Sequence, residues 1–128
     1  MDFYIIVILK HMHCFKDLEV WKLSRKFCAD IYHVTSSFPD SEKFGLTNQL
    51  RRASVSVPSN IAEGSSRSSN KDFSRFLEIA IGSAYEIETQ LLISSDLGFL
   101  NDRDMDILVA KLESIVKMTS RFRSTLQQ

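Results

Sequence analysis

Glycine and proline are scarce in this chain, whose 128 residues include 4 glycines and 2 prolines. A β-rich fold of this length needs many tight turns, which these residue types usually form, so their scarcity favours long helices joined by few loops. The chain also lacks an excess of charge, because 16 Lys and Arg residues balance 16 Asp and Glu residues. Nucleic-acid-binding domains more often carry a basic excess, so the overall balance argues mildly against such a partner.

Neither the cysteines nor the apolar runs indicate an exported or membrane protein. Cys14 and Cys28 form no CxxC pair and make no disulfide framework in a chain of this length. Cys28 lies at a helix-core spacing, so we expect a reduced, buried thiol and a cytoplasmic protein. A membrane-spanning helix needs about 20 residues, whereas the apolar run at residues 3–9 has seven. We therefore expect no membrane partner.

The amino-terminal run also lacks the features of a signal peptide, because Asp2 precedes it and no small-residue cleavage site follows it. Two interpretations remain open. The run is either a short extra strand or helical turn, or an artefact of an upstream start codon with Met12 as the true start, which we favour. We therefore expect an N-terminal extension at residues 1–14 and one domain at residues 15–128, a usual size for a single domain.

Apolar residues recur every three or four positions in four segments, which predicts four helices. We expect them at residues 17–37, 44–64 and 71–97, with the fourth capped by Asn101 or Asp102. Ser69 or Asn70 can cap the third helix. The loops between these segments are short, so the predicted fold is all-α, an antiparallel up-down-up-down four-helix bundle.

Three residues of the helical segments, Pro58, Gly64 and Gly82, are of types that have low helix propensity. Pro58 removes a backbone hydrogen bond and costs about 3 kcal/mol in a helix interior. It therefore either kinks a continuous helix, which we favour because Ile61 stays in phase with Val57, or starts a new one. Gly64 suits the residue just beyond a helix end. Gly82 lies in mid-helix, where we expect the close approach of another backbone to compensate for its low propensity.

The first and third predicted helices carry more apolar surface than one bundle can bury. Trp21 and Tyr32 widen the apolar arc of the first helix, and Ile79, Tyr85 and Leu92 form a second stripe on the third. Closed symmetry lets one surface bury itself repeatedly, so a homo-oligomer is the simplest way to cover these stripes.

The second predicted helix carries a polar stripe beside its apolar one. It is formed by Gln49, Arg52, Ser56, Asn60 and Glu63, at spacings of three and four. A catalytic role would need a histidine, a nucleophile elbow or an acid pair close by, and the sequence shows none. We therefore interpret Gln49, Ser56, Asn60 and Glu63 as a structural network that fixes the position of the helix.

Five stretches of sequence occur in the order typical of a known family. They are FKDLEVWKLS, FPDSEKFGL, GLTNQLRRASVSVPSNIAEG, FLEIAIGSAYEIETQL and DLGFL. Together they resemble the four-helix bundle family first noted in open reading frames inside intervening sequences of 23S rRNA genes. The resemblance covers residues 15–123, and residues 1–14 fall outside it.

The resemblance implies a four-helix bundle and a ring-like homopentamer more firmly than a function. A relative, the accessory variability protein of diversity-generating retroelements, assembles as a pentamer with a basic surface and associates with nucleic acid and a reverse transcriptase. By analogy, the expected partners are RNA or DNA and a reverse-transcriptase-like or other protein.

Several arginines are candidates for phosphate contacts, and repetition around a ring would strengthen binding despite a neutral net charge. The candidates are Arg51, Arg52, Arg67, Arg121 and Arg123. The alternative for Arg52 is an ion pair with Glu63, Glu86 or Glu88. Trp21, Tyr32 and Tyr85 could stack on bases, but we favour a packing role for them.

No motif for metal or cofactor binding is complete. His11-x-His13-Cys14 lacks a second group of ligands, and Glu63 and Glu86 lack the Glu-x-x-His motif of di-iron bundles. The sequence therefore predicts a non-enzymatic bundle, without metal or cofactor, that binds nucleic acid or a nucleic-acid-processing partner through a basic face. The alternative is a protein–protein scaffold without affinity for nucleic acid, and a hydrolase or metal enzyme is a weaker third option.

Overall fold

The computed structural model describes residues 14–127, and within them the fold is all-α, with four long helices and no strand. The prediction of four helices is confirmed. The short 3-10 helix η1 (Phe15–Asp17) leads into α2 (Glu19–Thr35), and η2 (Asp40–Glu42) precedes α3 (Leu46–Ser65). α4 (Asn70–Asp96) and α5 (Asp102–Leu126) complete the fold. The interpretations of residues 1–13, including a start at Met12 and ligands at His11 and His13, lie outside the described residues.

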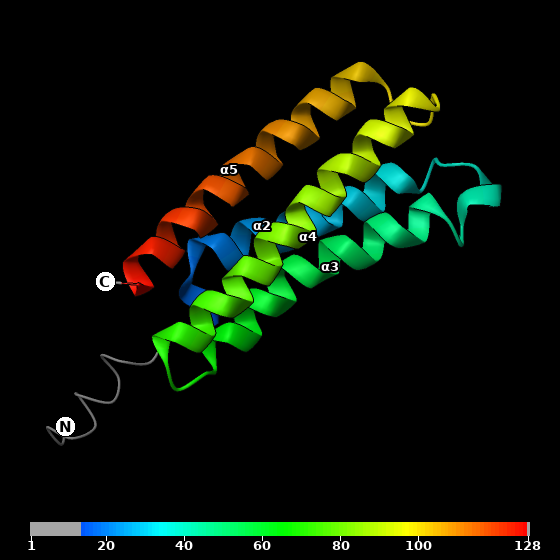
Figure 1. Ribbon diagram of the computed structural model, residues 1–128. Helices are drawn as coiled ribbons and strands as arrows, with labels where there is room; N and C mark the ends of the chain where they lie inside the picture. Colours follow the sequence, from blue (N-terminus) through cyan, green and yellow to red (C-terminus); the bar gives the residue numbers. More distant parts are fainter. Residues whose placement is uncertain (1–13, 128) are drawn as a thin grey trace, which may run out of the picture.

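The four long helices lie side by side around one apolar core (Figure 1). α3 packs against both α2 and α4, and α5 packs against both α4 and α2. Each helix contributes fully buried or nearly buried side chains at helical spacing, such as Ile31, Leu50, Leu77 and Leu112. Burying one such side chain contributes about 1.5–3 kcal/mol, so the core rather than intrinsic propensity holds the helices in place.

Side-chain caps define the beginnings of α4 and α5. Ser69 Oγ accepts a hydrogen bond from the backbone N–H of Asp72 at 3.1 Å. Asn101 Oδ1 accepts one from the N–H of Asp104 at 2.8 Å. The sequence placed both caps correctly to within a residue. The first helix begins later than expected, at Glu19, because Leu18 takes an extended conformation after η1.

Pro58 lies inside an unbroken α3, which confirms the expectation of a continuous helix. The expectation for Gly64 is wrong, because α3 continues to Ser65 and Gly64 is buried within it. A Cβ at Gly64 would lie 2.7 Å from Cβ of Phe76 and 2.9 Å from Cδ1 of Phe73. The missing side chain therefore allows α4 to approach α3 closely.

The expectation for Gly82 is also wrong within the chain, because a Cβ there would meet nothing within 4 Å. Gly82 is exposed on α4, the helix that also carries the exposed apolar side chains Ile79, Tyr85 and Leu92. These three side chains are 46%, 56% and 52% exposed, so the bundle leaves the second stripe of α4 uncovered, as its sequence predicts. None of the helices in residues 14–127 has the length and apolarity to cross a membrane.

Candidate nucleic-acid interface

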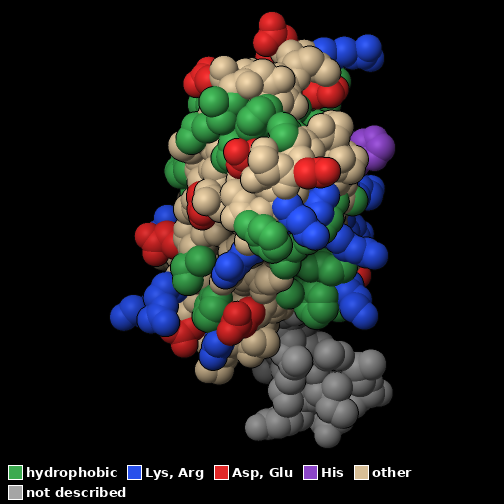
Figure 2. All heavy atoms as spheres, turned by 90° about the vertical axis from the view of Figure 1, so that its right-hand side faces the viewer, with side chains coloured by type: hydrophobic (Ala, Val, Ile, Leu, Met, Phe, Trp, Pro, Cys, Tyr) green, Lys and Arg blue, Asp and Glu red, His purple; other side chains and the backbone are tan. Residues whose placement is uncertain are grey.

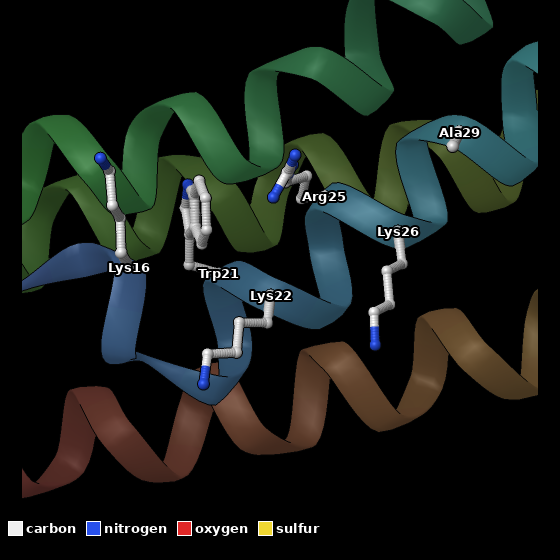
Figure 3. A pocket seen from close by; sticks show the side chains of 6 residues that line it. All are labelled: Lys16, Trp21, Lys22, Arg25, Lys26 and Ala29. Atoms are coloured by element: carbon white, nitrogen blue, oxygen red, sulfur yellow. The ribbon is translucent and has the colours of Figure 1, made fainter.

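Basic side chains follow the outer side of α2 from its first turns. Arg25 and Lys26 lie three and four positions after Lys22, so both are neighbours of Lys22 on the helix surface, and η1 adds Lys16 at the beginning of the helix. Together they line an open hollow of about 1020 Å³ (Figure 3), which we call the α2 hollow: Lys16, Trp21, Lys22, Arg25, Lys26 and Ala29.

The cations of the α2 hollow have no ion-pair partner among residues 14–127. The ion pairs in this part of the chain are Arg67–Glu63, Lys111–Asp30 and Arg123–Glu78. Asp17 and Glu19 are close in sequence to the hollow, but neither takes part in these pairs. Within residues 14–127, none of the four positive charges is therefore neutralised by an ion pair.

Trp21 provides the aromatic surface of the hollow. Its ring packs edge-on against Phe15, with centroids 5.2 Å apart and an interplanar angle of 72°. The guanidinium carbon of Arg25 lies 5.4 Å from the Trp21 ring centroid. Figure 3 shows the indole between the ends of Lys16 and Arg25, whereas Lys22 and Lys26 extend from the opposite flank of α2. The hollow thus combines an aromatic ring with positive charge on both flanks of one helix.

The predicted Arg51 is held within the chain instead of projecting freely. Its Nε donates to Thr35 Oγ1 at 3.0 Å, and its Nη2 donates to the Tyr32 carbonyl at 3.3 Å. Its guanidinium carbon also lies 4.7 Å from the Tyr32 ring centroid. Because the last four carbonyls of a helix lack intrahelical partners, Arg51 caps the carboxyl end of α2 from α3.

The other predicted arginines are spread over different parts of the surface. Arg67 pairs with Glu63 at 3.1 Å and lies over the ring of Phe76. Arg123 pairs with Glu78 at 3.1 Å and donates from Nε to Ser74 Oγ. The ion pairs with Glu63 and Glu78 therefore neutralise part of the positive charge of Arg67 and Arg123.

Arg52 and Arg121 are exposed, on α3 and α5 respectively. Arg52 lines a separate, smaller hollow between α3 and α4, together with Glu86. Because an acidic side chain shares this hollow, its charge is mixed. Of the five predicted arginines, Arg51, Arg67 and Arg123 therefore have partners within residues 14–127, and Arg52 shares its hollow with an acidic side chain.

The predicted polar stripe makes hydrogen bonds within α3 and across to α4. Ser56 Oγ lies 2.9 Å from Ser83 Oγ, and Gln49 Oε1 accepts from Gln90 Nε2 at 3.5 Å. Asn60 Nδ2 donates to the Ser56 carbonyl at 2.8 Å and to its hydroxyl at 2.9 Å. Glu63 faces solvent and pairs with Arg67, as described above.

The stripe does not have the geometry of a catalytic site. In the described part of the chain, the Ser56 hydroxyl contacts Asn60 and Ser83, and neither side chain can act as a general base. Residues 14–127 also contain no group of three or more His, Cys, Asp or Glu side chains placed to hold a metal ion.

Sequence reasoning missed the cations of the α2 hollow, although their signal was present. Residues 16–30 contain four basic and three acidic residues, a balance that conceals the basic group when charges are only summed. The helical spacing of Lys22, Arg25 and Lys26 makes them neighbours on one helix, and that spacing is readable from the sequence. The half-buried position of Trp21 beside them is a product of the fold.

Comparisons with known proteins agree on the fold and the family. A crystal structure of a protein of unknown function from the S23 ribosomal protein family of Bacteroides thetaiotaomicron superposes with a TM-score of 0.73. It is 22% identical, and the match covers 81% of this chain and 97% of that one. No curated protein matches this chain. The model of the family described as 23S rRNA-intervening sequence protein matches residues 16–121. The chain therefore belongs to the 23S rRNA-intervening sequence protein family.

Proposed function

We propose that this protein is a non-enzymatic, cytoplasmic, oligomeric helical bundle that binds RNA or DNA through the α2 hollow. The observation that carries the proposal is the group of four cations without ion-pair partners in residues 14–127, gathered around one tryptophan. Phosphates supply most of the affinity of nucleic-acid binding through such cations, and aromatic rings add stacking with bases.

A net charge of zero is compatible with this role. At physiological ionic strength, charges more than about 8 Å apart in solvent are largely screened from each other. A phosphate in the α2 hollow therefore responds mainly to the charges on η1 and α2, where the four cations outnumber Asp17, Glu19 and the paired Asp30, and little to charges on distant helices. Arg67 and Arg123, which already have acidic partners, contribute less to such a field.

We further propose that the up-down-up-down bundle assembles into a homo-oligomer, a pentamer by analogy with the accessory variability proteins. The uncovered stripe of Ile79, Tyr85 and Leu92 on α4 supports assembly, because exposed apolar side chains gathered on one helix mark interaction sites. α4 and α2 lie diagonally across the bundle, each packed between α3 and α5, so covering the outer side of α4 leaves the α2 hollow accessible. Repeating the hollow on each subunit would raise the avidity for a long nucleic acid.

The alternative function is a protein–protein scaffold, for example for a reverse-transcriptase-like enzyme. Two observations favour it: the uncovered stripe on α4, and the mixed surface in Figure 2, where acidic, basic and apolar side chains are interspersed. A scaffold would assemble without binding nucleic acid, which gives the two proposals opposite outcomes in one assay.

The assay is fluorescence anisotropy of a labelled structured RNA and of a matched DNA duplex, titrated with the purified protein. The variant Lys22→Gln/Arg25→Gln/Lys26→Gln removes three charges from the hollow. Its matched control, Lys43→Gln/Arg103→Gln/Lys117→Gln, removes three exposed charges elsewhere. We expect the first variant to lose at least tenfold in affinity and the control to lose less than threefold. Absence of binding by the unmodified protein at low salt would leave the scaffold as the function.

A further inference from the structure

The arrangement around Trp21 resembles a stacking platform flanked by two phosphate contacts. In Figure 3 the ends of Lys16 and Arg25 lie on either side of the indole, on one flank of α2. Lys16 comes from η1 and Arg25 from the second turn of α2. A nucleotide whose base lies on the indole would have its neighbouring phosphates directed toward these two cations.

The indole is held in position before any ligand arrives. Trp21 is half-buried, and the edge-on contact with Phe15 restricts its rotation. An aromatic ring that is already ordered loses little conformational entropy on binding. Trp21 therefore offers a positioned aromatic surface in the lining of an open hollow.

Arg25 shares this surface. Its guanidinium carbon lies 5.4 Å from the ring centroid, within the range of about 6 Å for a cation–π contact. The guanidinium therefore has to move aside before a base can stack on the same part of the ring. It can turn toward a phosphate while a base takes its place over the indole.

Stacking on Trp21 distinguishes single strands from duplexes. In a duplex the faces of the bases are covered by their neighbours, and only base edges are accessible in the grooves. Proteins that bind single strands use aromatic rings for unpaired bases beside a positively charged groove. We infer that the α2 hollow binds single-stranded nucleic acid, with one unpaired base stacked on Trp21 between Lys16 and Arg25. This inference rests on the proposed nucleic-acid binding and specifies its substrate class.

Trp21 is the one tryptophan of the chain, so its intrinsic fluorescence reports on the site directly. The experiment titrates the unmodified protein with an oligo(dT) strand of about 12 nucleotides, a length within the usual range of single-strand sites. A duplex of the same length serves as comparison, and anisotropy of a labelled copy of each gives the affinity. We expect the single strand to quench Trp21 fluorescence strongly and the duplex to leave it nearly unchanged.

The variant Trp21→Leu removes the aromatic ring and keeps an apolar side chain against Phe15. It should weaken single-strand binding about 5- to 150-fold, the range that corresponds to one stacked base, and change duplex binding less than twofold. Trp21→Phe should restore part of the affinity. Thermal melting followed by circular dichroism verifies that both variants fold. If Trp21→Leu does not fold, the quenching of Trp21 fluorescence in the unmodified protein tests the inference instead.

Two results would overturn the inference in different ways. Salt-sensitive binding of strand and duplex without quenching of Trp21 would refute stacking and leave the proposed nucleic-acid binding intact. Failure of both nucleic acids to bind at low salt would refute the inference together with the proposed function.

Discussion

Replacement by alanine at two glycines inside helices, Gly64 and Gly82, is expected to change the stability of the fold in opposite directions. Gly64 is buried in α3 against α4, and Gly82 is exposed on α4 with no atom near its missing Cβ. Replacing glycine by alanine inside a helix gains about 0.5–1 kcal/mol of stability. Gly82→Ala should show this gain, whereas at Gly64 the new methyl group meets the neighbouring helix.

The magnitude at Gly64 follows from its surroundings. The new Cβ would lie 2.7 Å from Phe76 Cβ, whereas ordinary contacts begin at 3.4 Å. The difference, 3.4 − 2.7, is about 0.7 Å. Phe76 Cβ is fixed to the backbone, so α3 and α4 must separate by about that much. Overpacking of this kind usually costs about 1–3 kcal/mol. After subtraction of the helical gain of about 0.5–1 kcal/mol, Gly64→Ala should destabilise the fold by up to about 2.5 kcal/mol.

The assay is urea denaturation of both variants and the unmodified protein, followed by helical circular dichroism. Each 1 kcal/mol should also appear as a change of about 3–5 °C in melting temperature for a chain of this length. Measurement at two protein concentrations separates effects within one subunit from effects on assembly, because only the latter depend on concentration. If Gly64→Ala stabilises the protein as much as Gly82→Ala does, the close approach of α3 and α4 is not as we describe it.

Three further changes test other parts of the account. Arg51→Ala should lower stability by about 1–2 kcal/mol, because it removes two hydrogen bonds and the contact with Tyr32. The variant should keep its nucleic-acid affinity within twofold of the unmodified protein. A larger loss of affinity in a folded variant would mean that Arg51 belongs to the interface. Ser69→Ala should destabilise the protein by about 0.5–2 kcal/mol in urea denaturation, through loss of the α4 cap, and an unchanged midpoint would contradict that cap. Ile79→Ser/Leu92→Ser should convert an oligomer into smaller species, measured as a lower molar mass by light scattering, while the helical circular dichroism signal persists. An unchanged mass would place the interface elsewhere.

Much of the fold follows from the sequence because helical periodicity and capping are local signals. The stripe of Leu50, Val57 and Ile61 is continuous through Pro58, and the helix is too. Ser69 and Asn101 cap their helices through their own side chains, so neighbouring residues are enough to find them. The role of Gly64 was misjudged because the role of a missing side chain depends on the helix opposite, which no local pattern specifies, and Gly82 has no neighbouring atom near its missing Cβ within its own chain.

The candidate interface was less predictable than the fold for a related reason. An arginine in a sequence shows its charge but not its partner. Arg51 lies in the most distinctive segment of the chain, yet Tyr32 and Thr35 occupy its guanidinium. Lys22 and Lys26 lie on the first predicted helix, and only the fold shows that they have no ion-pair partner within residues 14–127.

The salt dependence of binding tests the central claim most directly. The logarithm of the binding constant for a single strand falls with the logarithm of salt concentration by about 0.7 for each neutralised phosphate. With four cations in the α2 hollow, the account predicts a slope near −3 per occupied site. Lys22→Gln/Arg25→Gln/Lys26→Gln should reduce the magnitude of the slope by about 2, and the control variant of Lys43, Arg103 and Lys117 should leave it unchanged. Equal slopes for the two variants would contradict the placement of the interface on α2.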